Sequence, residues 1–180
     1  FTPTVTRLAI CLVAAIALTG VFVMVRRLAN MPVAVATTLL TALYPVWFTQ
    51  STLAHADIYA AAGTLWALAS ALHELPSARH GWYAALWFSL AALAKETAIV
   101  TPLTLVVWHL WETHRKPAFA RGHWRAAIQF ALPVLPLCAW YGYHFHKTGY
   151  IFGNPQFLRY NATTTLHFVR FLLALAQRLM

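Results

Sequence analysis

Charged residues are scarce in this sequence: Asp, Glu, Lys and Arg make up 9% of its 180 residues, whereas 61% are hydrophobic. A soluble domain typically carries about 25% charged residues, so this composition excludes an ordinary soluble protein. Apolar runs recur along the whole chain, which one secretory signal peptide does not explain. The sequence therefore predicts an integral membrane protein with several membrane segments.

Cysteine is scarce as well. Cys11 and Cys138 both fall within apolar runs, which implies neither a disulfide nor a metal cluster. Two pairs of other metal-ligand residues have a spacing of two, which does not bring both side chains to one face of a helix. These pairs are His55 with Asp57 and His144 with His146. We therefore expect no cofactor and no metal, with a divalent ion shared with residues beyond this sequence as the alternative left open.

Acidic residues number only four, against thirteen Lys and Arg residues, and the formal net charge is +9. An excess of positive charge also occurs in nucleic-acid-binding proteins, but here the basic residues lie mostly between the apolar runs. That distribution is typical of orientation signals in membrane proteins, because Lys and Arg favour the cytoplasmic side. We therefore expect a lipid bilayer, and no nucleic acid, as a partner.

The apolar runs predict an all-α transmembrane bundle of about seven membrane segments. Pro32 suits the first turn of the second helix, where its missing N–H would be unpaired anyway, and Pro45 is expected to kink or end that helix. The chain begins without Met and ends inside an apolar run, so we interpret residues 1–180 as a single transmembrane domain of a longer polytopic protein. The predicted segments are 5–25, 32–49, 58–75, the two arms of a short hairpin over 82–111, 126–143, and one that begins at Leu166.

Lys95 and Glu96 lie side by side near the middle of an apolar stretch over residues 81–112, and they decide its topology. A single helix over 82–111 would be about 45 Å long, which exceeds a hydrocarbon core of about 30 Å. It would also place both charges near the bilayer centre, which is energetically expensive. A turn at 94–97 brings both charges to an interface instead.

The distribution of positive charge favours the turn. With the hairpin, eight Lys and Arg residues share one side of the membrane and four lie on the other, whereas a single helix gives five against six. Because orientation signals are asymmetric, we predict the hairpin, with the more basic side in the cytoplasm. That side holds Arg26, Arg27, Arg79, Arg115, Lys116, Arg121, Arg125 and Arg178, and the other holds Arg7, Lys95, Lys147 and Arg159.

This topology gathers three polar features on the extracytoplasmic side: the corner at His55 and Asp57, the turn at Lys95 and Glu96, and the loop 144–161. Each feature places charged or polar groups beside apolar helices. We expect them to form one site for chemistry on a polar head group attached to a lipid.

Three segments combine these features in a recognisable order: YPVWFTQSTLAHADIYAAAGTLWAL, LAALAKETAIVTPL and WYGYHFHKTGYIFGNPQFLRYN. The first has a proline-ended helix, then a serine, then an aspartate that opens the next helix. The second has a lysine and a proline among small residues, and the third has a Trp followed by Thr-Gly. Over about residues 44–161 the chain thereby resembles the GT-C superfamily of membrane glycosyltransferases, in the branch of protein mannosyltransferases (glycosyltransferase family 39) and aminoarabinose transferases.

The resemblance implies a membrane-embedded, inverting glycosyltransferase that takes a sugar from a polyprenyl-phosphate donor. Transfer would occur on the extracytoplasmic side of a multi-pass protein in the bacterial cytoplasmic (inner) membrane, with the acceptor (lipid, glycan or protein) left open. Such enzymes carry their principal catalytic Asp in a long loop after the first helix, and this sequence has no such loop. We therefore expect that Asp to lie upstream of Phe1.

The candidate catalytic residues are Asp57 and Glu96. Asp57 is interpreted as a proton acceptor in sugar transfer, or as an acid that binds the acceptor or a metal. Its simpler alternative is a cap at a helix N-terminus. Glu96 is interpreted as a second acid, or more simply as the counter-ion of Lys95 or a cap.

The candidate substrate-binding residues are basic. Lys95 would hold the donor phosphate and stabilise the leaving group as negative charge develops, or it is an interfacial anchor paired with Glu96. Lys147 and Arg159 would clamp phosphate, the arginine in a bidentate way, or belong to an aromatic and basic belt at the membrane interface. His55 joins this set because it lies at the same polar corner.

Two other functions stay open from the sequence. A transporter or flippase for lipid-linked sugars would also be polytopic with few intramembrane charges, but it should show repeats and broken helices paired across two halves. We find no internal repeat. A membrane assembly subunit without chemistry would use Lys95 and Glu96 as a buried structural pair.

Overall fold

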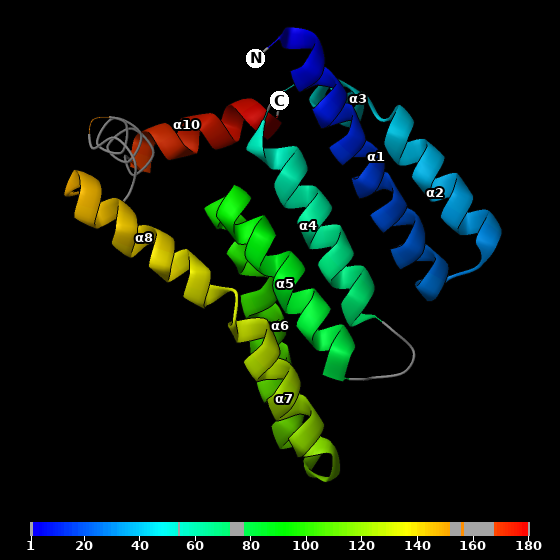
Figure 1. Cartoon of the computed structure of the whole chain (residues 1–180), viewed down its shortest axis with the longest axis vertical. Coiled ribbons are helices and arrows are strands. Elements are labelled where there is room, and N and C mark those ends of the chain that lie inside the picture. Colours follow the sequence, from blue (N-terminus) through cyan, green and yellow to red (C-terminus); the bar gives the residue numbers. More distant parts are fainter. Residues whose placement is uncertain (1, 54, 73–77, 152–155, 157–167, 180) are drawn as a thin grey trace. The chain divides into compact units, whose positions relative to one another are not determined.

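A computed structural model describes residues 2–53, 55–72, 78–151, 156 and 168–179 (Figure 1). Every regular element within these ranges is a helix, which confirms the predicted all-α fold. The chain divides into two compact units, Phe1–Leu137 and Cys138–Met180. The expectation of a single domain over residues 1–180 stays a prediction.

The first unit is a row of packed helices. α1 lies between α2 and α4, α4 packs on α5, and α7 packs on both α5 and α6. α8 (Val134–Thr148) begins in this unit and continues in the second, which also contains α10 (Phe168–Leu179). The elements that precede α8 are α1 Pro3–Leu28, α2 Met31–Leu43, α3 Pro45–Gln50, α4 Ala56–Ala71, α5 Ala78–Ala94, the 3-10 helix η1 Glu96–Ile99, α6 Val100–Arg115, the 3-10 helix η2 Pro117–Phe119 and α7 Ala120–Ala131.

Local sequence explains where the first helices end. α1 has Arg26 and Arg27 in its last turn, where cations are stabilising because the C-terminal carbonyls carry partial negative charge. Asn30 caps α2 by accepting a hydrogen bond of 3.1 Å from a backbone N–H of its first turn. Tyr44 has an extended backbone (φ −63°, ψ 127°), because a following proline disfavours helical geometry. The predicted helix over 32–49 is therefore divided into α2 and α3.

The predicted hairpin is confirmed in the fold. Lys95 has an extended backbone (φ −150°, ψ 118°) and separates α5 from η1. Leu105 and Val106 of α6 pack against the buried cluster that contains Phe88 of α5. Phe88 precedes Lys95 by seven positions and Leu105 follows it by ten. Since both pack in the same cluster, the chain reverses direction near Lys95 and α6 runs back to the level of Phe88. The side of the membrane on which this turn lies stays a prediction.

Small residues allow the helices of the first unit to pack closely, as they do in membrane helix bundles. A Cβ at Gly63 would lie 2.9 Å from the backbone oxygen of Trp87, so the absence of a side chain lets α4 approach α5. The rings of Phe88 and Phe130 meet edge to face, with their centroids 6.1 Å apart. The cluster that they complete consists of Ala67, Ala84, Phe88 and Phe130. This packing sets the start of α4 beside the end of α5.

Large apolar side chains cover much of the outside of the first unit. Leu8, Leu12 and Leu40 are 65%, 63% and 70% exposed. Exposed apolar surface on this scale marks contact with a membrane or another protein. It agrees with a chain whose outer surface faces lipid.

Two helical stretches among the described residues are long and apolar enough to cross a membrane, Pro3–Leu28 and Pro117–Thr148. The first is α1, which is about 39 Å long at 1.5 Å per residue. The second contains a turn at 132–133, so the predicted segment 126–143 is not one continuous helix. Pro133 lies at this turn, because its ring and missing N–H interrupt helical hydrogen bonding.

Candidate functional site

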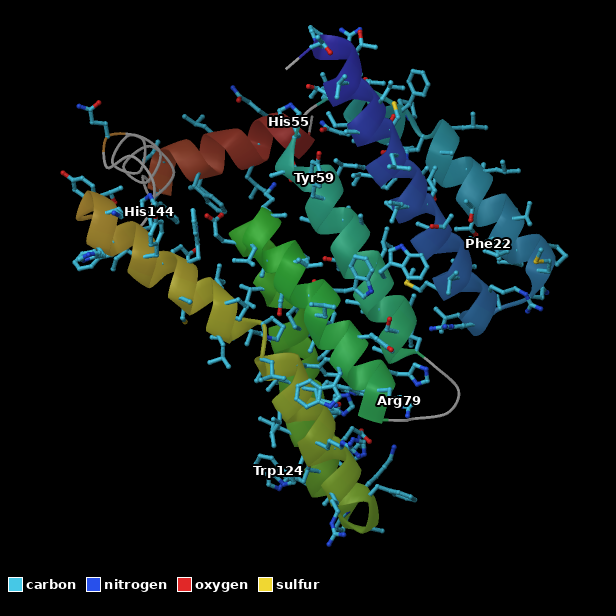
Figure 2. The ribbon with its side chains drawn as sticks, in the orientation of Figure 1. Phe22, His55, Tyr59, Arg79, Trp124 and His144 are labelled. Carbon is cyan, nitrogen blue, oxygen red and sulfur yellow. The ribbon has the colours of Figure 1, made fainter. Side chains whose placement is uncertain are left out.

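The polar corner before α4 places two of the predicted residues. His55 precedes the first residue of α4 with an extended backbone (φ −110°, ψ 145°), and its side chain makes no capping hydrogen bond. Asp57 lies in the first turn of the helix, where the partial positive charge of the N-terminus stabilises a carboxylate. Figure 2 shows His55 at this end of α4, with Tyr59 one turn further along. Both predicted residues are exposed.

An ion pair joins Asp57 to Lys95. The two residues are 38 positions apart in the sequence but meet because α4 and α5 pack side by side in opposite directions (Figure 1). The side chains are 54% and 42% exposed, respectively. An exposed pair of this kind contributes about 0–1 kcal/mol to stability. The pair therefore leaves both charged groups accessible to a ligand.

The predicted pairing of Lys95 with Glu96 is wrong. Lys95 is directed to the carboxylate of Asp57, because its extended backbone separates it from the short helix that Glu96 begins. Glu96 is exposed in the first turn of η1. Within the described part of the chain, no ion pair joins it to a basic side chain.

A groove of about 530 Å³ lies beside the ion pair, among α2, α3 and α4. Asp57 lines it and thereby connects it with Lys95. Most of its lining residues are apolar or aromatic, and its polar residues besides Asp57 are two threonines of α2 and one glutamine of α3. The lining residues are Thr37, Leu40, Thr41, Tyr44, Val46, Trp47, Gln50, Asp57, Ile58 and Ala61. We call it the α2–α4 groove.

Two polar atoms of the groove residues are buried without a hydrogen-bond partner: Nε1 of Trp47 and Oε1 of Gln50. One is a donor and the other an acceptor. Leaving such a group unsatisfied costs about 1–3 kcal/mol. Both atoms lie beneath the surface of the groove, so a ligand could reach them only if these side chains turned toward it. The sequence carried a signal for these residues, since positions 47 and 50 after Pro45 fall on one face of a helical turn.

The remaining predicted residues belong to the second unit or to residues outside the description. Lys147 lies in the last turn of α8 and is exposed. In the same helix, Nδ1 of His144 lies 2.8 Å from the backbone oxygen of Tyr150, and Gly149 ends the helix with a left-handed backbone (φ 74°). Arg159 lies outside the described residues. The predicted convergence of this loop with Asp57 and Lys95 stays a prediction.

A family comparison bears directly on these residues. Residues 1–140 match the profile of the dolichyl-phosphate-mannose-protein mannosyltransferase family. The chain belongs to this family. The match includes Asp57, Lys95 and the whole α2–α4 groove. Comparison with curated proteins and with solved structures gives no significant match.

Membership of the family confirms the resemblance to the GT-C superfamily of membrane glycosyltransferases. Glycosyltransferase activity that uses a lipid-linked sugar is the family's chemistry.

Proposed function

We propose that this protein transfers a sugar from a polyprenyl-phosphate donor to an acceptor on the extracytoplasmic side of the membrane. The single observation that carries the proposal is the Asp57–Lys95 ion pair at the rim of the α2–α4 groove. It combines a cation for a phosphate, a carboxylate for a proton and an adjoining surface that is largely apolar.

Lys95 serves the leaving group. When the bond between the anomeric carbon and the phosphate oxygen breaks, negative charge increases on the polyprenyl phosphate. A fixed cation therefore stabilises the transition state more than the ground state, which is what accelerates a reaction. Before the donor binds, Asp57 neutralises Lys95. The donor phosphate then replaces Asp57 as the partner of Lys95.

Asp57 serves the acceptor. Once the donor phosphate occupies Lys95, the carboxylate is released from its ion pair and becomes a stronger base. It then accepts the proton of the acceptor hydroxyl as that oxygen attacks the anomeric carbon. His55, two positions before Asp57, contributes to binding the donor head group. Glu96, next to Lys95, is a second candidate acid for the proton transfer.

The α2–α4 groove binds the two parts of the donor that flank its phosphate, the isoprene chain and the sugar. Apolar lining residues such as Leu40, Val46 and Ile58 suit the first isoprene units. The unpaired Nε1 of Trp47 and Oε1 of Gln50 are buried and would suit sugar hydroxyls after a rotation of their side chains, because each hydroxyl both donates and accepts. Lys147, in the last turn of α8, and Arg159 are proposed as further phosphate ligands.

Two competing functions are disfavoured. A transporter or flippase does not need the combination of a cation with a potential base, and the family match is to transferases. An assembly subunit was expected to bury Lys95 as half of a structural pair. Lys95 instead pairs with Asp57 across two helices and is 42% exposed.

The test is transfer from a radiolabelled lipid-linked sugar by the full-length protein, with expression matched between variants. Lys95→Ala should lose most activity, whereas Arg7→Ala should retain it. Arg7 is a matched control because it is exposed and lies on the same predicted side of the membrane. Equal activity of both variants would leave Lys95 as an interfacial anchor and remove the support for this site.

A further inference from the structure

A second cavity, of about 550 Å³, lies at the opposite end of the first unit from Asp57. It forms where the end of α4 and the start of α5 meet α6, η2 and α7. Its wall contains the buried Gln129 and Phe130 and the exposed Phe119. The lining residues are Ser70, Ala71, His80, Gly81, His109, Ala118, Phe119, Arg121, Gly122, His123, Arg125, Ala126, Gln129 and Phe130. We call it the basic pocket.

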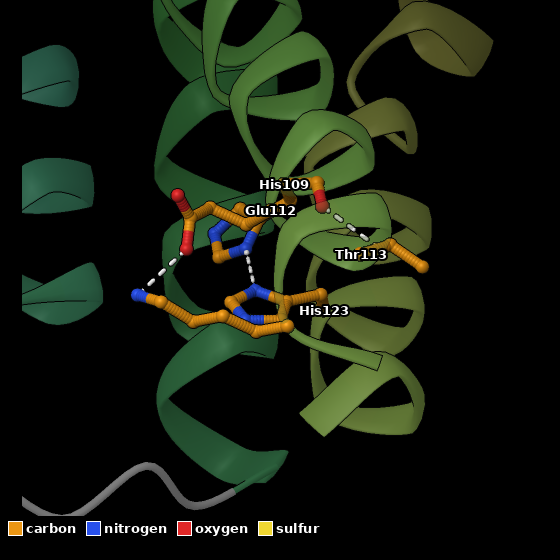
Figure 3. Close-up of polar contacts among 5 residues, drawn as sticks. His109, Glu112, Thr113 and His123 are labelled. Carbon is orange, nitrogen blue, oxygen red and sulfur yellow. Dashed lines mark hydrogen bonds and ion pairs between the residues drawn. The ribbon is translucent and has the colours of Figure 1, made fainter. Parts of the chain in front are cut away.

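The ionisable residues that line this pocket are all basic among those the structure describes. Five lining side chains carry basic nitrogen atoms, and no described carboxylate is among the lining residues. The acid nearest in sequence to the pocket residues of α6 is Glu112, which is 6% exposed. Nζ of Lys116 lies 2.8 Å from its carboxylate (Figure 3), so its charge is compensated. The five basic residues are His80, His109, Arg121, His123 and Arg125.

Two of the imidazole rings are held together. Nδ1 of His109 lies 3.1 Å from Nδ1 of His123 (Figure 3), so one ring donates and the other accepts. In the accepting ring the proton lies on Nε2, which makes that nitrogen a donor. A further proton binds Nε2 of the donating ring and does not break the hydrogen bond between the rings. The pair can therefore offer one or two N–H groups to an anion.

Arg121 and Arg125 lie one helical turn apart on α7, hence on one face of it. A guanidinium presents paired N–H groups whose geometry matches phosphate oxygens. No three described His, Cys, Asp or Glu side chains gather as metal ligands would. The arrangement suits an oxyanion with several acceptor oxygens.

The surroundings of the pocket resemble a membrane interface. Trp111, Phe119 and Trp124 are 55%, 69% and 53% exposed, and exposed Trp is typical of the level of lipid head groups. Arg115 lies over the ring of Trp111, 4.7 Å from its centroid. These exposed aromatic side chains beside the pocket suit the apolar chains of a lipid whose anionic head group enters it.

We propose that the basic pocket binds the phosphate of an anionic phospholipid from the adjacent leaflet. Basic pockets between membrane helices are suited to such head groups. The phosphate would lie among Arg121, Arg125 and the histidine pair, with its acyl chains along the aromatic surface. This site is separate from the α2–α4 groove, and the proposal does not depend on the transferase assignment.

Gly122 offers a clean way to test the pocket. It lines the pocket, and a Cβ at this position would meet no atom within 4 Å. Gly122→Asp therefore adds a repelling carboxylate without a steric clash, near the N-terminus of α7, where an acid favours the helix. Gly122→Ala is the matched control, because it adds the Cβ without the charge.

The experiment counts lipids bound to the full-length protein by native mass spectrometry, with phosphatidylglycerol, phosphatidylcholine and inorganic phosphate as probes. We expect phosphatidylglycerol to bind at least about ten-fold more tightly than phosphatidylcholine, and Gly122→Asp to weaken it by about ten-fold, the scale of one lost charge-assisted contact. Gly122→Ala should bind like the unmodified protein. The paired variants Arg121→Gln with Arg125→Gln should also lose binding, whereas Arg26→Gln with Arg79→Gln removes equal charge outside the pocket and should not.

Three results would overturn the proposal. Equal binding of phosphatidylglycerol and phosphatidylcholine would remove the role of net charge. Displacement of phosphatidylglycerol by equimolar inorganic phosphate would identify a site for a soluble phosphate rather than for a lipid. Equal losses in the pocket variants and in the Arg26/Arg79 control would show general electrostatic attraction. Melting temperatures of all variants separate these results from unfolding, and Arg121→Lys with Arg125→Lys should restore part of the binding.

Discussion

The two ends of α4 carry different chemistry on the same apolar scaffold. Asp57 in its first turn and Ser70 in its last are thirteen positions apart, or about 20 Å along the helix. At the first end one acid compensates one lysine beside a mainly apolar groove. At the other end five basic side chains surround a pocket whose nearby acid is already paired with Lys116.

The difference agrees with the two proposed functions. In the proposed transfer reaction, a charged substrate replaces one counter-ion, so Lys95 becomes available when the donor displaces Asp57. A pocket whose described lining contains arginines and no carboxylate attracts an anion. Of the nine Lys and Arg residues of the first unit, seven lie at the basic end and only Arg7 and Lys95 lie at the other.

The largest expected effect separates the two ends by chemistry. Asp57→Asn keeps the shape of the side chain but removes the base, and should lower sugar transfer by about a hundred-fold or more, the scale of general base catalysis. Phosphatidylglycerol binding should be unchanged. Initial rates with a radiolabelled lipid-linked sugar measure the loss. Transfer within about three-fold of the unmodified protein would reduce Asp57 to an acid in the first turn of α4, where its charge contributes about 0.3–1 kcal/mol of stability.

Lys95→Ala should lower transfer by about ten- to a thousand-fold, the scale of losing one strong electrostatic contact in the transition state. Lys95→Arg should retain part of the activity, because the charge survives although the shape changes. Both proteins should still insert, since removing a charge from an apolar run does not oppose insertion. If Lys95→Arg is as inactive as Lys95→Ala, charge is not the contribution of this residue.

Much of this arrangement could be predicted from the sequence, where the signals are local. The turn at Lys95 followed from helix length and from the distribution of Lys and Arg, and the break before Pro45 followed from proline geometry. Glu96 was the wrong prediction for the partner of Lys95, because Asp57 becomes the neighbour of Lys95 only through the packing of α4 on α5. That packing depends on Gly63 and on alanines, whose pattern in an apolar run does not identify the partner helix.

The basic pocket was not predicted, for a different reason. Arg121 and Arg125 were counted as loop residues that orient the chain, with a helix starting only at 126. In the structure α7 starts at Ala120, which places both arginines on a helix facing the pocket. The histidines at 109 and 123 come together because α6 and α7 form a tight antiparallel pair.

A smaller effect tests the groove. Trp47→Phe removes the unpaired Nε1–H and should raise the KM for the donor by about two- to ten-fold, the scale of one neutral hydrogen bond. Removing a buried, unsatisfied donor stabilises the protein, whereas the smaller ring loses packing against Ile10, Ala14 and Ile58, so we expect only a small change in melting temperature. Donor titrations and thermal unfolding measure the two quantities. A lower melting temperature with an unchanged KM would assign Trp47 to packing alone.

The smallest effect concerns the acid beside the basic pocket. Glu112→Gln should change phosphatidylglycerol binding by no more than about three-fold, because Lys116 already compensates the charge of Glu112. Transfer should not change. A large loss of lipid binding, measured by the same mass spectrometry, would show that Glu112 positions the histidine pair.

The most direct measurement is a double-mutant cycle on sugar transfer with Asp57→Asn, Lys95→Ala and the two combined. Residues that act as a unit are strongly non-additive. If the ion pair is one functional unit, the double variant should fall no more than about three-fold below the weaker single variant. If the two losses multiply, Asp57 and Lys95 act independently, and the claim that the ion pair is one functional unit is contradicted.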